Sequence, residues 1–138
     1  MPEVAGIVGA PIRSEADLIG TRVVLREAAE SVGLGVVELT KLLTAASELA
    51  RNILRHARGA GGVMTVRIVT DAGRTGVRAT FTDQGPGIAD VDLCMQDGFS
   101  TARGLGVGLP GSRRLVDAFE LTSEPGQGTS VSILMWRR

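Results

Sequence analysis

The stretch Ser47–His56, SELARNILRH, places a carboxylate at Glu48 and a carboxamide at Asn52, four residues apart, among apolar residues at helical spacing. Side chains at positions i and i+4 lie on one face of an α-helix. Both polar groups are therefore expected to project the same way, and His56 extends the row by one turn. Such a row also occurs on ordinary solvent-exposed helix faces, so the rest of the chain must decide between a polar surface and a site.

The residues around this stretch predict helices. Leucines and alanines recur with a broad apolar side from about Val36 to Arg58, which is typical of a helix packed on a core. Upstream, a helix is expected from about Glu15 to Val32, with the hydroxyl of Ser14 capping its start. Residues 4–12 are small and apolar, and predict a weak edge strand.

Beyond residue 62 the pattern changes from helical to alternating. Val63–Thr70 and Val77–Thr82 flank a glycine-containing turn and predict a β-hairpin. A helix is expected from about Pro110 to Phe119. Its proline lies in the first turn, where the missing N–H costs little. Strands are expected at residues 121–123 and 129–136. The mixture predicts an α+β fold.

Composition narrows the class of protein. A chain of 138 residues fits one domain, residues 1–138, and can bury a substantial core. Fifteen basic and fifteen acidic residues give a net charge of zero, which argues against nucleic acid or an anionic membrane as partner. No apolar run is long enough to span a bilayer. The single cysteine, Cys94, cannot form an internal disulfide, so we expect a cytoplasmic protein, and nothing nearby indicates a catalytic role for it.

A strand that ends in Asp83 leads directly into Gly85 and Gly87. Glycine lets the backbone turn sharply and approach a ligand closely. Asp83 could then accept a hydrogen bond from an exocyclic amine while the two glycines admit a flat ring. A plain β-turn has the same pattern.

A second glycine run, Gly104, Gly106 and Gly108, precedes a predicted helix. Its amides could converge on phosphates at the helix N-terminus, or the run could be a surface loop. It is not a P-loop, because no Gly-Lys-Ser/Thr follows. It also lacks the βαβ context of a dinucleotide fingerprint.

The order of these pieces carries more information than any one of them. The helix with Glu48 and Asn52, then DQGPGI at 83–88, the run at 104–108 and GQGT at 126–129 resemble the N, G1, G2 and G3 boxes of the GHKL ATPase superfamily. This resemblance implies a Bergerat-type two-layer α/β sandwich, with a mixed, mostly antiparallel sheet and helices on one face. SELARNI at 47–53 and DGFST at 97–101 are most similar to the small serine/threonine kinases of bacterial partner-switching and stressosome systems.

The resemblance implies a role for each residue of the pocket. Glu48 would act as general base and Asn52 would bind Mg²⁺ beside ATP. Asp83 would bind the adenine amino group, with Gly87 against the ring and Thr129 assisting through water.

The two glycine boxes complete the implied site. Gly85 would shape the adenine pocket, and Gly104, Gly106 and Gly108 would close over the triphosphate as a lid. Arg103, at the edge of the lid, would either neutralise charge on the γ-phosphate or be a surface arginine. His56 is expected to be structural.

The family further implies an ATP-dependent kinase that phosphorylates a serine or threonine of a STAS-domain antagonist, and that binds and activates a PP2C-type phosphatase when released. The alternative is an anti-sigma factor that sequesters a sigma factor in an ATP-dependent manner. A degenerate ATP-binding domain is disfavoured because Glu48 and Asn52 are both present. A sensor histidine kinase is disfavoured because no histidine precedes Glu48. The acceptor residue and the upstream signal stay open.

Overall fold

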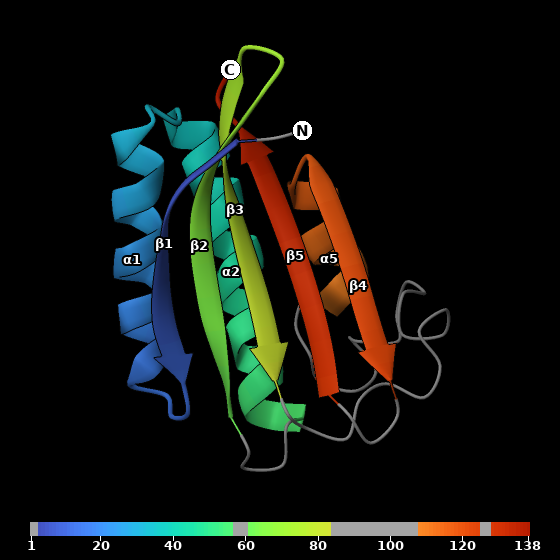
Figure 1. Ribbon diagram of the computed structural model, residues 1–138. Coiled ribbons are helices and arrows are strands. Elements are labelled where there is room, and N and C mark those ends of the chain that lie inside the picture. Colours follow the sequence, from blue (N-terminus) through green and yellow to red (C-terminus); the bar gives the residue numbers. More distant parts are fainter. Residues whose placement is uncertain (1–2, 57–60, 84–107, 125–127) are drawn as a thin grey trace.

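The computed structural model describes residues 3–56, 61–83, 108–124 and 128–138. Within them a five-stranded sheet carries helices on one face and leaves the other face without a helix (Figure 1). The elements are β1 (Glu3–Ile12), α1 (Asp17–Ser31), α2 (Val36–His56), β2 (Gly62–Asp71), β3 (Arg74–Asp83), α5 (Gly108–Leu115), β4 (Ala118–Glu124) and β5 (Gly128–Trp136).

The strand order is β1-β2-β3-β5-β4, and all four of these pairings are antiparallel. The prediction of an α+β sandwich with a mostly antiparallel sheet and helices on one face is confirmed. The N-terminal strand β1 lies at one edge, as its small apolar residues indicate. The hairpin β2–β3 joins it to the centre of the sheet. No helix among the described residues is long and apolar enough to cross a membrane.

The core lies between α2 and the helix-facing side of the sheet. Burial of apolar side chains from both layers removes them from water, which is the main force that holds the two layers together. Because α2 crosses behind the middle of the sheet (Figure 1), its buried residues form the centre of this core. The principal buried residues are Leu42, Leu49 and Ile53 of α2, with Met64, Phe81 and Ile133 of the sheet.

The predicted helix from Pro110 to Phe119 is wrong at its end. Helix α5 ends at Leu115, and β4 begins at Ala118. The cause is a long-range pairing: the N–H of Asp117 donates to the carbonyl of Leu134 at 2.9 Å, and β4 then pairs with β5. Strand pairing with a buried partner therefore overrides the local helical pattern.

The expected cap of α1 is also wrong. The hydroxyl of Ser14 does not cap the helix, which has Ala16 at its N-cap and no side-chain cap. Instead, the carboxylate of Asp17 accepts hydrogen bonds from the backbone N–H groups of Arg13 and Ser14, at 2.8 and 3.1 Å. A carboxylate in the first turn thus ties the preceding loop to the helix start, where its charge is favoured by the helix dipole.

Gly76 has no room for a side chain. A Cβ at this position would lie 2.7 Å from the carbonyl oxygen of Met135 and from Cε3 of Trp136. The indole of Trp136 lies beside this strand and receives the guanidinium of Arg74 at 4.2 Å from its centroid. The strand pair β3–β5 therefore depends on glycine at this position.

We expect Gly76→Ala to lower the free energy of unfolding by about 1–3 kcal/mol, because the carbonyl of Met135 belongs to the sheet backbone and cannot move aside. Urea denaturation measures the change. Gly20→Ala is the matched control: nothing lies within 4 Å of its Cβ position in α1, so alanine should stabilise the helix by about 0.5–1 kcal/mol. Equal stability of Gly76→Ala and the parent protein would contradict the expectation.

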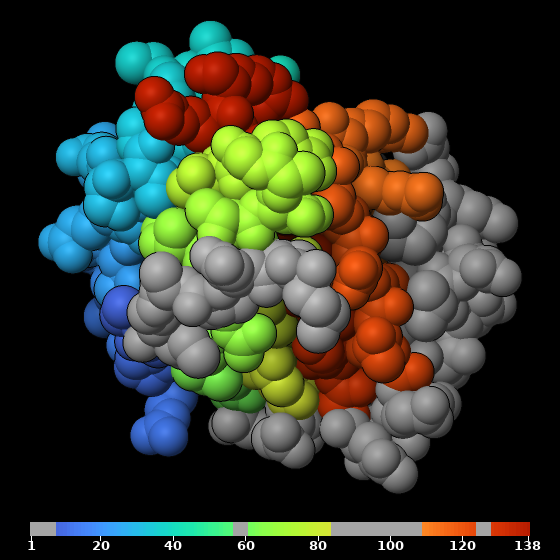
Figure 2. Space-filling model, turned by 45° about the horizontal axis from the view of Figure 1, so that its top comes forward, coloured from blue at the N-terminus to red at the C-terminus, as the bar shows by residue number. Residues whose placement is uncertain are grey.

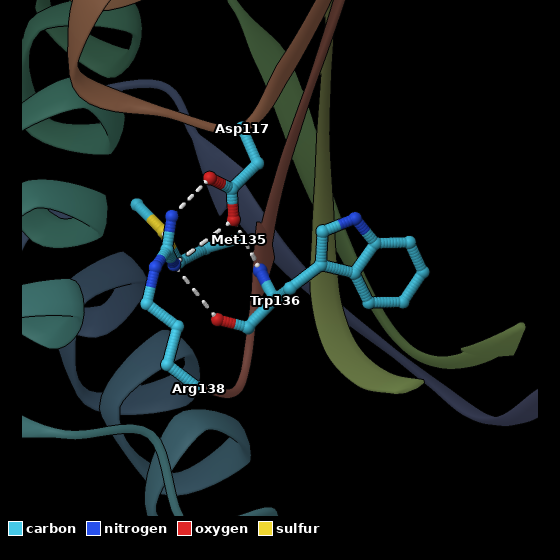
Figure 3. Close-up of polar contacts among 4 residues, drawn as sticks. All are labelled: Asp117, Met135, Trp136 and Arg138. Atoms are coloured by element: carbon cyan, nitrogen blue, oxygen red, sulfur yellow. Dashed lines mark hydrogen bonds and ion pairs between the residues drawn. The ribbon is translucent and has the colours of Figure 1, made fainter. Parts of the chain in front are cut away.

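Asp117 joins the last strand to the α5–β4 junction (Figure 3). One carboxylate oxygen accepts the backbone N–H of Trp136 at 2.7 Å, and the other pairs with the guanidinium of Arg138. Arg138 also donates to the carbonyl of Trp136 at 3.2 Å. Partial burial raises the pKa of Asp117, but the bonds from Arg138 and Trp136 and the charges of Arg138 and Lys41 outweigh it and leave the pKa lowered.

This lowered pKa predicts the pH dependence of the contact. A carboxylate whose pKa is lower in the folded protein contributes stability above its unfolded pKa, near roughly 3.9, and loses it as the pH falls through the lower folded value. The melting temperature of the parent protein should therefore exceed that of Asp117→Asn at pH 7. The difference should shrink as the pH falls below about 4. Calorimetry across this range tests the expectation, and a difference that does not change with pH would contradict it.

Candidate functional site

Helix α2 places Glu48 and Asn52 one turn apart on the same face of the helix. Glu48 is only 7% exposed, and its Oε1 atom has no hydrogen-bond partner among the described residues. The Oδ1 atom of Asn52 is likewise buried without a partner in the described part of the chain. Buried oxygens without partners are costly and uncommon in folded proteins. Two of them one turn apart on a helix make these residues a candidate ligand site.

Asp83 ends β3 and contacts the start of β5. Its Oδ1 accepts the backbone N–H of Thr129 at 3.3 Å, so the structure brings together two predicted site residues that lie 46 positions apart in sequence. The antiparallel pairing of β3 with β5 causes this approach. Thr82 lies opposite Ser130, so Asp83, which follows Thr82, comes next to Thr129, which precedes Ser130.

Ser123 of β4 lies next to Thr129 and was not predicted from the sequence. Its Oγ atom lies 3.1 Å from Oγ1 of Thr129 and donates to the carbonyl of Gly128 at 3.2 Å. Ser123 and Thr129 are direct partners in the β4–β5 pairing. In the sequence, Ser123 could have been found only because Ser123 and Thr129 lie on either side of a glycine-containing turn, where hairpin pairing would place them opposite each other. The Ser123 hydroxyl therefore contacts the side chain of the residue whose backbone N–H donates to Asp83.

Gly62 allows the end of α2 to approach the end of β3. A Cβ at position 62 would lie 3.2 Å both from Cδ1 of Ile53 and from Cα of Asp83. The helical turn that contains Asn52 therefore lies next to the strand end that carries Asp83. In Figure 1 the C-terminal end of α2, the end of β3 and the start of β5 lie at the same end of the molecule.

Several predicted residues lie outside the described residues, namely Gly85, Gly87, Arg103, Gly104 and Gly106, together with Cys94. Their expected roles stay predictions. Gly108 is the first residue of α5, so the glycine run does lead directly into a helix. His56 is the last residue of α2 and is exposed, and its structural role likewise stays a prediction.

The described residues fit a nucleotide and a divalent cation. An unpaired amide oxygen such as Oδ1 of Asn52 is a ligand of the kind that Mg²⁺ prefers. An ionised carboxylate accepts about four hydrogen bonds, so Asp83 can bind the Thr129 amide and an exocyclic amine together. Glu48 supplies a carboxylate one turn before Asn52. The three side chains thus match an adenine contact, a metal ligand and a base.

The chain was compared with known proteins. The family model HATPase_c, described as histidine kinase-, DNA gyrase B-, and HSP90-like ATPase, matches residues 38–138. The serine/threonine-protein kinase RsbT of Bacillus subtilis (strain 168) is 43% identical over 127 residues, which are 92% of this chain and 94% of RsbT. The anti-sigma F factor of Pasteuria penetrans is 34% identical over 101 residues, 70% of this chain and 67% of that protein.

A solved structure shares the fold. The crystal structure of the RsbU and RsbW domains of Rv1364c from Mycobacterium tuberculosis superposes with a TM-score of 0.68 at 18% identity, and covers 97% of this chain. The present chain spans 34% of that longer chain, so this likeness shows the fold alone. The family model covers α2 from Glu38 onwards and everything after it, including every candidate site residue. The chain therefore belongs to the family of histidine kinase-, DNA gyrase B- and HSP90-like ATPases.

Proposed function

We propose that this protein is an ATP-dependent serine/threonine protein kinase. It phosphorylates a STAS-domain antagonist in a bacterial partner-switching pathway and, once released, binds and activates a PP2C-type phosphatase. The observation that carries the proposal is the buried carboxylate of Glu48, whose Oε1 atom lacks a partner among the described residues one turn before Asn52. The 43% identity to a serine/threonine-protein kinase over nearly all of both chains supports it.

The side chains of the site divide the work of phosphoryl transfer. Asp83 and Thr129 hold the adenine end of ATP, and Asn52 holds Mg²⁺, which would neutralise charge on the phosphates. Glu48 accepts the proton of the acceptor hydroxyl as its oxygen bonds to the γ-phosphorus. The bond between the γ-phosphorus and the β–γ bridging oxygen breaks, and ADP leaves. Such transfer depends mainly on positioning and charge neutralisation, so this small set of groups suffices in principle.

The glycine run and Arg103 have proposed roles at the phosphate end. Gly104, Gly106 and Gly108 would cover the triphosphate, and the backbone N–H groups at the start of α5 would bind it. Arg103 would neutralise the negative charge that develops on the γ-phosphate. Gly85 and Gly87 would keep the adenine pocket open for the ring.

The second candidate function is an anti-sigma factor that sequesters a sigma factor when ATP is bound. The similarity to an anti-sigma F factor favours it, but at 34% identity over 70% of the chain it is the weaker of the two likenesses. The kinase proposal accounts for more of the sequence.

Transfer to a purified partner tests the proposal. We expect the protein, incubated with Mg²⁺, γ-labelled ATP and its cognate STAS protein, to label that protein on one serine or threonine, located by mass spectrometry. Alanine at the acceptor should abolish the label. Binding of the STAS protein without transfer would refute the kinase proposal. Capture of a cognate sigma factor, with no effect on a PP2C-type phosphatase, would favour the anti-sigma function.

A further inference from the structure

A hollow of about 420 Å³ lies between the start of α2, the end of α5 and the last residues of the chain. We call it the α2–α5 hollow. It is at the opposite end of α2 from Glu48 and Asn52. Figure 2 shows the turquoise start of α2 and the red C-terminal segment close together at this end of the molecule. It is lined by Val37, Glu38, Lys41, Arg114, Leu115, Val116, Asp117, Met135 and Arg138.

The lining combines apolar surface with positive charge. Val37 is 62% exposed at the rim, although valine is usually buried, and the half-buried Leu115 and Val116 provide further apolar surface. Three cationic and two anionic side chains line the hollow, which leaves it with a net positive charge. Asp117 is already paired with Arg138. The hollow therefore favours a partner that brings an apolar side chain and a carboxylate.

The spacing of the rim indicates the shape of that partner. Val37 and Lys41 are four residues apart, so they lie one above the other on α2. A helix packed along α2 presents its own residues with the same spacing and can set an apolar residue against Val37 and an acidic one against Lys41. A second copy of this chain fits poorly, because a twofold contact would bring the same positive surface against itself.

We infer that the α2–α5 hollow binds an acidic amphipathic helix of the PP2C-type phosphatase, with an apolar side chain in the hollow and a carboxylate at Lys41. This inference rests on the proposed function, and it names the surface that the phosphatase uses. Glu48 lies eleven residues after Val37 along α2, or about 16 Å at helical rise. The substrate must reach Glu48, whereas a partner that is not phosphorylated needs a site outside the catalytic centre.

If both partners bind in this way, the short separation predicts that they exclude each other. A folded domain of about 100 residues has a radius of gyration near 13 Å. Two such domains whose contact points lie about 16 Å apart on one helix would overlap. The STAS protein at Glu48 and the phosphatase at the hollow therefore compete for the same side of α2, although their contact residues differ.

Two pairs of variants on α2 test the inference. Val37→Asp and Lys41→Glu change the rim, whereas Val36→Asp and Thr40→Glu place the same acidic side chains on the adjacent residues, which are exposed and do not line the hollow. All four positions are exposed, and acidic residues near a helix N-terminus are favourable, so folding should be retained. Each variant is titrated calorimetrically with the purified phosphatase and assayed for transfer to the STAS protein.

We expect Val37→Asp and Lys41→Glu to weaken phosphatase binding by about tenfold or more, as the loss of a central interface contact does. Val36→Asp and Thr40→Glu should stay within about twofold, and all four should phosphorylate the STAS protein at the parent rate. A STAS protein with alanine at its acceptor should displace the phosphatase, and a stable ternary complex would refute the exclusion.

The remaining outcomes separate this inference from the proposed function. Equal losses in all four variants, no loss in any, or a parent protein that does not bind the phosphatase would overturn the hollow as its docking site. Binding of a sigma factor that is lost only in Val37→Asp and Lys41→Glu would assign the hollow to that other partner and overturn the phosphatase. Phosphatase binding that follows the expected pattern, without transfer to the STAS protein, would refute the kinase and leave the hollow assigned.

Discussion

Replacement of Glu48 by glutamine is expected to slow phosphoryl transfer by about 10²–10⁴-fold, the usual contribution of a general base. Glutamine has the size of glutamate and keeps a hydrogen-bond acceptor, but it cannot take the proton of the acceptor hydroxyl. Affinity for ATP should change by less than about threefold, because the proposed adenine and metal contacts lie on Asp83 and Asn52. Single-turnover transfer and equilibrium nucleotide binding measure the two quantities separately.

The same substitution should leave stability unchanged or increase it. Glu48 is 7% exposed with an oxygen that lacks a partner among the described residues, and an amide costs less to bury than a carboxylate. A purely structural role for Glu48 would instead give a lower melting temperature together with lower activity. Glu30→Gln, on the exposed side of α1, is the matched control and should affect neither quantity. Parallel losses of transfer and ATP binding in Glu48→Gln would show that its proposed role is wrong.

Replacement of Asp83 by asparagine is expected to weaken ATP binding by about 10–100-fold, because a hydrogen bond to a charged group contributes about 1.5–3 kcal/mol. Asparagine can keep the bond that the Thr129 N–H now donates to Asp83. The local strand contact should therefore survive, and the loss should come from the adenine side. Fluorescence titration with a labelled ATP analogue, competed with ATP, measures the affinity.

A nucleotide without the exocyclic amine provides the control for Asp83. Purine riboside triphosphate should bind the parent protein about 10–100-fold less tightly than ATP, because it cannot donate to Asp83. Asp83→Asn should discriminate much less between the two nucleotides, since the contact is already weakened. If the variant discriminates as strongly as the parent, Asp83 does not contact the amino group.

Local patterns in the sequence predicted most of the elements. The apolar side of residues 36–56 gave α2 nearly to its observed bounds, because a helix that packs on a core must repeat its apolar residues every three to four positions. The hairpin β2–β3 followed from alternation around a turn. The end of α5 could not be predicted, since Leu115–Phe119 suits a helix or a strand and only pairing with β5 decides.

Part of the candidate site could likewise be predicted from local sequence, and part depends on the tertiary structure. Glu48 and Asn52 are found from spacing alone, because one helical turn brings them together. Ser123 and the hydrogen bond between Asp83 and Thr129 depend on the registers of β5 with β3 and β4. The α2–α5 hollow needs residues from α2, α5 and the end of β5, which no local pattern relates.

The sequence by itself determined the helix that carries SELARNILRH, the alternating strands and the family to which the boxes belong. The helix and the strands depend on residues close together in the chain, where backbone geometry sets the spacing of side chains, and the family depends on the order of short boxes along the chain. Only the tertiary structure decided that Glu48 Oε1 and Asn52 Oδ1 lie buried without a partner among the described residues, that Asp83 meets Thr129, and that Asp117 holds Arg138 beside a hollow. These contacts join residues up to 46 positions apart, and their existence depends on how the layers pack and how the strands register.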